Sequence, residues 1–229
     1  MPRISITPWA DKASTPACRT PSISAGSWRQ VVRGISPDSL LDSYHAERHP
    51  VAARVLRNTM AQIALLRRND DGLKAARDVV SDLLAMNEPR QRVGAMMSGL
   101  DIRYDLGEGH ALLGRRMPDL DLTIEGRATK LFTLLHDARG VLLNFGATWT
   151  FDIASWTDRI KFIDASYDGP WELPAIGEVA APKAVLVRPD GHVAWVGDAN
   201  HRGLEEALLI WCGAAAAAQQ SRSLGTERT

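Results

Sequence analysis

The chain has 229 residues, of which 45% are hydrophobic and 24% are charged, a composition typical of a globular protein rather than a disordered one. Its 27 basic residues balance 27 acidic ones, so no net field attracts the chain to nucleic acid or to an anionic membrane, and we expect neither as a partner. No apolar run approaches the roughly 20 residues that cross a bilayer. Since there is no signal-peptide pattern and Cys18 and Cys212 form no motif, we expect a cytoplasmic, thiol-reduced protein.

Residues 1–30 show neither helical nor strand periodicity, whereas a helical pattern begins at Ser36, which is a favourable N-cap before Pro37. Apolar residues then recur at helical spacing as far as Leu66, which predicts one long helix or two helices that break near Pro50. A second helix is expected from the pattern in DGLKAARDVVSDLLA, and a short third one after Pro89. These helices make up a segment, residues 31–104, whose core is thin, so we expect it to pack on something else.

Residues 105–118 are rich in glycine and charge and are interpreted as a linker. Beyond them the pattern changes to strands in GVLLNFG, IKFIDASY and AVLVRPDGHVAWVG, the last being a hairpin around Pro189-Asp190-Gly191. Helices are expected in KLFTLLHDA and LEEALLIWCGAAAAA. The fold class is therefore α/β, a helical segment followed by an α/β domain over residues 119–215, with a disordered polar tail at 216–229.

Residues 141–213 resemble the thioredoxin fold. LLNFGATW stands where the strand of that fold enters its redox helix, and APKAVLVRPDGHVAWVG stands where its cis-proline leads into a hairpin, which makes Ala181–Pro182 the expected cis bond. Thr150 and Ile153 occupy the cysteine positions, and neither residue can form a thiolate or a disulfide. We therefore expect a thioredoxin-like scaffold used for packing rather than a thiol oxidoreductase, a function for which Cys212 cannot substitute.

Three features carry a further resemblance: the helical stretch LLDSYHAERHPVAARVLRNTMAQIALLRR, the segment LLGRRMPDLDL and the cysteine-free thioredoxin-like domain. With them the chain resembles the C-terminal part of the FAD-dependent aromatic hydroxylases, the group A flavin monooxygenases that act on aromatic polyketides. The resemblance runs from Val31 to Cys212. It implies FAD, NADPH and oxygen-dependent hydroxylation for the family, in which these helices close the back of the flavin domain. The glycine-rich phosphate loop, the NADPH motif and the substrate sheet of that family lie upstream of the matching segment.

The same resemblance offers an explanation for residues 1–30. Read one base earlier, with synonymous codons chosen to suit, their DNA can encode DAAHQHHPVGGQGLNTGVQDAVNLGWKLA, which is similar to the flavin-binding Asp and Gly-Gly-Gln-Gly turn of the family. One extra base near Arg29 and Gln30 restores the family frame at Val31. We interpret residues 1–30 as an out-of-frame, disordered segment, and the upstream nucleotide sequence tests this hypothesis.

Other residue pairs are weak candidates for chemistry. His45 and His49 flank Glu47 without the His-Glu-x-x-His pattern of a zinc site, so hydrogen bonding at a surface or between domains is favoured. Asp198 and His201 follow the hairpin with no nucleophile nearby and are interpreted as turn residues. Packing in the core is favoured over ligand stacking for the tryptophans of the α/β domain, which are Trp149, Trp156, Trp171, Trp195 and Trp211.

We therefore predict no catalytic, cofactor-binding or metal-binding residue in this chain. The chain is expected to be an inactive fragment of an FAD-dependent monooxygenase that binds neither FAD nor NADPH. The alternative is a non-catalytic thioredoxin-like interaction or dimerisation module. In either case an apolar helical face left in water favours self-association.

Overall fold

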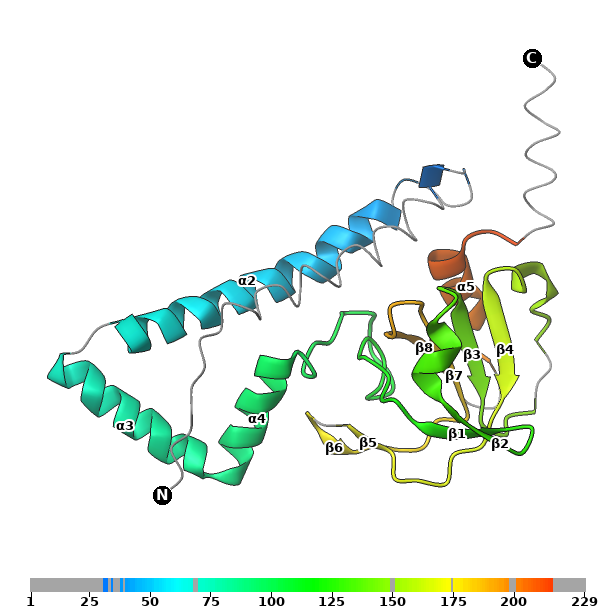
Figure 1. The fold of residues 1–229 in the computed structure, drawn as a ribbon. Helices are drawn as coiled ribbons and strands as arrows, with labels where there is room; N and C mark the ends of the chain where they lie inside the picture. Colours follow the sequence, from blue (N-terminus) through cyan, green and yellow to red (C-terminus); the bar gives the residue numbers. More distant parts are fainter. Residues whose placement is uncertain are drawn as a thin grey trace, which may run out of the picture.

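The computed structural model describes residues 31–32, 34, 38, 40–67, 70–148, 151–173, 175–197 and 201–215. Within them the chain forms a helical arm followed by an α/β domain (Figure 1), which confirms the expected fold class. Several expectations concern residues outside the described ones: the out-of-frame segment 1–30, the helix start at Ser36 and Pro37, the core packing of Trp149, the redox-position residue Thr150, the turn residue Asp198 and the tail 216–229.

The helical arm consists of α2 (Leu40–Arg67), α3 (Asp71–Ala85) and α4 (Asn87–Ser98). Figure 1 shows α2 reaching away from the α/β domain, while α3 and α4 lead the chain back to it. Helix α2 passes through Pro50 without a break. Proline leaves the carbonyl four residues earlier without its N–H, and that residue, Ala46, is exposed, so water can satisfy the carbonyl. Of the described helices, none is both long enough and apolar enough to cross a membrane.

Helices α3 and α4 have clear local stop and start signals but little burial. The Asp70 carboxylate caps α3 by accepting the N–H of Leu73 at 3.0 Å, and Gly99 ends α4 in a left-handed conformation with φ of 72°. Helix α3 contains no buried residue, and Ala95 is the buried residue of α4. The arm therefore has no core of its own.

The α/β domain is built on a four-stranded sheet with the order β4-β3-β7-β8. Strands β3 and β4 are parallel, and the other neighbouring pairs are antiparallel. This is the arrangement that the thioredoxin resemblance predicts, and the expected hairpin at Pro189-Asp190-Gly191 joins the last two strands. The bounds are β3 (Gly140–Asn144), β4 (Ile160–Asp164), β7 (Ala184–Val187), β8 (Val193–Gly197) and a C-terminal helix α5 (Leu204–Cys212).

Both faces of this sheet are buried, because alternate residues of the central strands enter two different cores. Val141 and Leu143 of β3 belong to one core, together with Trp171 and the segment before β1. Leu142, between them, belongs to the other, together with α5, Trp156 and Trp195. The three tryptophans thus pack in the cores, as expected.

Several short elements were not indicated by the sequence. Two hairpins flank the main sheet: β1 (Asp121–Ile124) with β2 (Arg127–Lys130), and β5 (Glu172–Leu173) with β6 (Gly177–Glu178). The helix expected in KLFTLLHDA is a 3-10 helix, η2 (Leu131–Leu135). It ends early because Ala138, at φ of 58°, takes the left-handed conformation that turns the chain into β3.

The redox-helix position and the expected cis-proline also differ from a thioredoxin. A 3-10 turn, η3 (Ala154–Trp156), is the helical element described between β3 and β4. The Ala181–Pro182 bond is trans, since the described residues contain no cis peptide. Trans is the cheaper state of an X-Pro bond by about 0.5–1 kcal/mol. With this bond trans, the N–H of Phe145 still donates to the carbonyl of Lys183 at 2.8 Å.

Residues 105–118, interpreted as a linker, lie against β8. The N–H of Gly114 donates to the carbonyl of Val193 at 2.9 Å, and the N–H of Val193 donates to the carbonyl of Arg115 at 2.8 Å. The segment therefore covers the outer edge of β8, an edge that would otherwise expose unpaired backbone groups. The close approach requires glycine at 114, where φ is 75° and a Cβ would lie 2.0 Å from the Tyr104 carbonyl oxygen.

We expect Gly114→Ala to lower the free energy of unfolding by more than about 2 kcal/mol, because it combines left-handed strain with a backbone clash. Gly126→Ala is the matched control, since Gly126 also has φ of 75° but meets no atom within 4 Å. Denaturant unfolding of both variants measures the difference. Equal losses in the two variants would show that the approach to Tyr104 is not tight.

Candidate functional site between the helical arm and the α/β domain

The described residues form one buried cluster of charged side chains, at the junction of α2 with the turn between β7 and β8. Arg188, which follows β7, donates to both carboxylate oxygens of Glu47 on α2, at 2.6 and 3.1 Å. It also donates to both oxygens of Asp190, at 3.2 and 2.7 Å. The side chains of Arg188, Glu47 and Asp190 are only 4%, 6% and 8% exposed. One guanidinium thus joins two carboxylates from segments far apart in the sequence.

The turn itself holds Asp190 in place. Its carboxylate accepts the backbone N–H of His192 and contacts the His192 Nδ1 atom, both at 3.1 Å. Burial alone would raise the pKa of Asp190, but Arg188 and His192 lower it well below its usual range. Burial would likewise lower the pKa of Arg188, whereas Asp190 and Glu47 raise it. Arg188 and Asp190 therefore both stay charged near neutral pH.

Aromatic rings enclose the Arg188 guanidinium. Its Cζ atom lies 4.2 Å from the ring centre of Trp211 on α5 and 5.5 Å from that of Tyr104. The Tyr104 ring also packs on His192, with 4.5 Å between ring centres. Trp211 is therefore half-buried at the junction, which adds a contact with Arg188 to the packing role expected for it.

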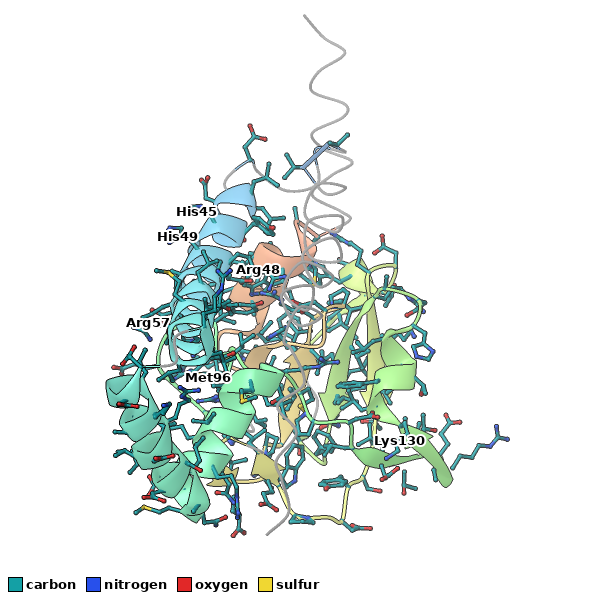
Figure 2. All side chains as sticks on the ribbon, turned by 60° about the vertical axis from the view of Figure 1, so that its left-hand side comes forward. His45, Arg48, His49, Arg57, Met96 and Lys130 are labelled. Carbon is teal, nitrogen blue, oxygen red and sulfur yellow. The ribbon has the colours of Figure 1, made fainter. Side chains whose placement is uncertain are left out.

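Two further polar contacts connect α2 to the segment that follows α4. Arg48 donates to the Tyr104 hydroxyl at 3.1 Å, and Arg54 forms an ion pair with Asp101 at 3.1 Å. Figure 2 shows Arg48 on the side of α2 that faces the α/β domain and His45 and His49 on the outer side. These contacts fix the direction in which the arm leaves the domain.

The expected absence of a metal site at His45 and His49 stays a prediction, although the geometry favours it. Their rings are 5.0 Å apart and exposed, whereas Glu47 is buried on the opposite side of the helix with Arg188. No group of three or more metal-ligating side chains occurs among the described residues. His201, with φ of 50°, accepts the N–H of Leu204 at its carbonyl and so lies in the turn before α5.

Thiol chemistry has no support at Cys212. The thiol is buried, and burial raises its pKa to about 12, although Arg159 acts in the opposite direction. A thiol with this pKa is protonated at neutral pH and is a poor nucleophile. At the thioredoxin redox position the described part of the chain offers Ile153, a half-buried side chain of the second core.

Sequence reasoning missed the role of Arg188, Glu47 and His192. The available signal is weak: an arginine directly follows the wholly apolar strand AVLV, at a point where a buried side chain needs a partner. The partner is 141 positions away, and no local pattern on α2 distinguishes Glu47 from the exposed Asp42.

Comparison with known proteins places this architecture in context. Residues 110–215 match the family model described as aromatic-ring hydroxylase, C-terminal. Rifampicin monooxygenase of Streptomyces venezuelae is 39% identical over 186 residues, which are 81% of this chain and 35% of the relative. The chain thus spans about a third of the length of the curated relatives it matches.

Solved structures of related enzymes contain a part that is similar to this chain. OxyS anhydrotetracycline hydroxylase from Streptomyces rimosus is similar, with a TM-score of 0.80 at 35% identity, over 88% of this chain and 41% of that chain. The rebeccamycin biosynthetic enzyme RebC, solved with reduced flavin, shares the fold at 23% identity and a TM-score of 0.57, over 88% of this chain and 41% of that chain.

We expect Glu47→Gln to lower the free energy of unfolding by about 3 kcal/mol, because it leaves a buried guanidinium with one carboxylate fewer. This is the low end of the roughly 3–5 kcal/mol that the loss of one partner of a buried ion pair costs, because Asp190 still neutralises Arg188. Asp121→Asn is the control, because it breaks an ion pair with Lys130 that is exposed and should leave stability nearly unchanged. Equal unfolding midpoints for the two variants would contradict the assignment of Glu47 as the anchor of the arm.

Proposed function

We propose that this chain, whose residues 110–215 match the aromatic-ring hydroxylase C-terminal family model, is the C-terminal part of an FAD- and NADPH-dependent aromatic monooxygenase and has no such activity by itself. The observation that carries the proposal is the coverage: 81% of this chain corresponds to only 35% of a monooxygenase relative. In this proposal the α/β domain and the arm are structural parts, and the chemistry belongs to the part of the relatives that this chain does not span.

The ends of the described helices support the absence of flavin binding. A dinucleotide pyrophosphate binds where a glycine-rich loop meets a helix N-terminus whose N–H groups and positive dipole are free. Here each N-terminus carries acid instead. The Asp70 carboxylate already accepts the N–H of Leu73 in α3. Acidic side chains lie in the first turns of the other helices: Asp42 in α2, Glu88 in α4, and Glu205 and Glu206 in α5. These carboxylates repel a pyrophosphate.

A second candidate, a non-catalytic module that self-associates, rests on one feature of the arm. Its outer half carries large apolar side chains that are 37–69% exposed, which we call the exposed helical face. They are Leu56, Met60, Ile63 and Leu66 of α2, Val79, Val80 and Leu83 of α3, and Met86 between α3 and α4. Large apolar side chains exposed in this number are typical of an interface that lacks its partner. A second copy of the chain can cover it.

For flavin binding we expect a negative result. The purified chain is mixed with FAD, separated from the excess and examined by visible absorption, with RebC as the positive control because that protein has been solved with reduced flavin. We expect no flavin band and no NADPH-dependent oxygen uptake. A stoichiometric flavin band with oxygen uptake would overturn the proposal that this chain is inactive alone.

For self-association we expect the molar mass from light scattering to rise with protein concentration. The double variant Leu56→Glu, Met60→Glu should shift the chain towards monomer, because charge on the exposed helical face opposes its burial. Arg57→Glu, at a neighbouring exposed position of α2, is the control and should leave the concentration dependence in place. A chain that stays monomeric at every concentration would exclude this candidate.

A further inference from the structure

A cavity of about 370 Å³ lies where the chain leaves the helical arm and enters the α/β domain. Its walls come from segments that are distant in sequence: the residues after α4, the segment before β1, η2 and the β5–β6 hairpin. The apolar part of the wall includes Leu100, Met117, Phe132 and Leu173. Its volume falls within the roughly 300–1,000 Å³ that is usual for small-molecule sites.

The cavity is lined by more positive than negative side chains. Arg115 and Arg116 contribute two guanidinium groups, and Asp119 contributes one carboxylate. One Asp119 oxygen is already engaged, since it accepts the backbone N–H of Phe132 at 2.9 Å. The cavity therefore has an excess of positive charge next to apolar walls.

Arg115 has a hydrogen-bond donor that no atom of the described residues uses. Its Nε atom is buried and has no hydrogen-bond partner, and it forms no ion pair among the described residues. Burial lowers the pKa of Arg115, and the neighbouring positive charge of Arg103 lowers it further. Asp101 acts on Arg115 as an opposite charge and partly offsets these effects, but the buried Nε donor still lacks a hydrogen-bond partner in the described part of the chain. A buried donor without a partner is destabilising, and an anion beside it removes that cost.

Another part of the wall is a stack of an arginine on an aromatic ring. The Arg116 guanidinium lies over the Phe132 ring, with 4.8 Å between its Cζ atom and the ring centre. Met117 and Leu173 beside it are 1% and 4% exposed, so this wall is held rigidly by the core beneath. A planar apolar group would lose little water and meet a surface that is already formed.

We propose that this cavity binds a small, flat aromatic carboxylate, with the carboxylate on Arg115 and the ring system against Phe132 and Leu173. A single carboxylate matches the excess of one positive charge. A phosphate is disfavoured, because it is more strongly hydrated and carries more charge than this largely apolar cavity can balance. The site is independent of flavin and of the inactivity proposed for the chain.

The test is isothermal titration calorimetry of the full chain with 2-naphthoate, and with 2-naphthylmethanol as its neutral counterpart. We expect saturable binding of one naphthoate per chain. Arg115→Gln should weaken it roughly tenfold or more, the usual size of a charge-assisted hydrogen bond, while the alcohol should bind weakly and equally to both forms. Arg127→Gln, which removes an exposed arginine outside the cavity, is the matched control and should bind as the parent does.

Two further variants separate the cavity from other apolar surfaces. Ala175→Trp fills the cavity from its own wall and should abolish naphthoate binding. The double variant Leu56→Glu, Met60→Glu, on the exposed helical face, should leave it unchanged. Circular dichroism and thermal unfolding confirm that each variant is folded. The proposal is overturned if the parent shows no saturable binding, or if naphthoate binds Arg115→Gln and Ala175→Trp as tightly as it binds the parent.

Discussion

The position of the helical arm depends on one buried arginine. Arg188 ends a central strand and meets Glu47 of α2, Asp190 of its own turn and the ring of Trp211 on α5. A charge in such a place is costly to desolvate, and it is tolerated only because two carboxylates neutralise it. The pairing is directional as well as strong, since a guanidinium accepts carboxylates only at fixed angles. It therefore specifies one orientation of α2, where apolar contacts alone would permit several.

The parts of the fold that are predictable from sequence are those written in short-range patterns. The buried strands are continuous apolar runs, such as VLL in β3 and AVLV in β7, because both faces of the sheet are covered. The helices of the arm follow the 3.6-residue period and end at Gly99 or begin at Asp70. The 3-10 helix after β2 and the two extra hairpins are not predictable in this way, because they are too short for a period to develop.

The candidate site is less predictable, for a related reason. Whether Pro50 breaks α2 depends on whether the carbonyl of Ala46 reaches water, which is a property of the packed structure. Whether Glu47 is exposed or buried depends on Arg188, 141 positions later. The resemblance to the hydroxylase C-terminal part indicates the order of the elements, but it does not locate the charged cluster that joins the arm to the domain.

The sequence separation between Glu47 and Arg188 has a consequence for biosynthesis. A ribosome makes the arm first, and α2 emerges complete while the strand that ends in Arg188 has yet to be translated. During that interval Glu47 is a solvated carboxylate on a helix with few buried side chains, so nothing fixes the arm in place. The guanidinium can draw α2 in only after Arg188, 141 positions beyond Glu47, has appeared. The nascent chain therefore carries α2 without its anchor until Arg188 has been translated.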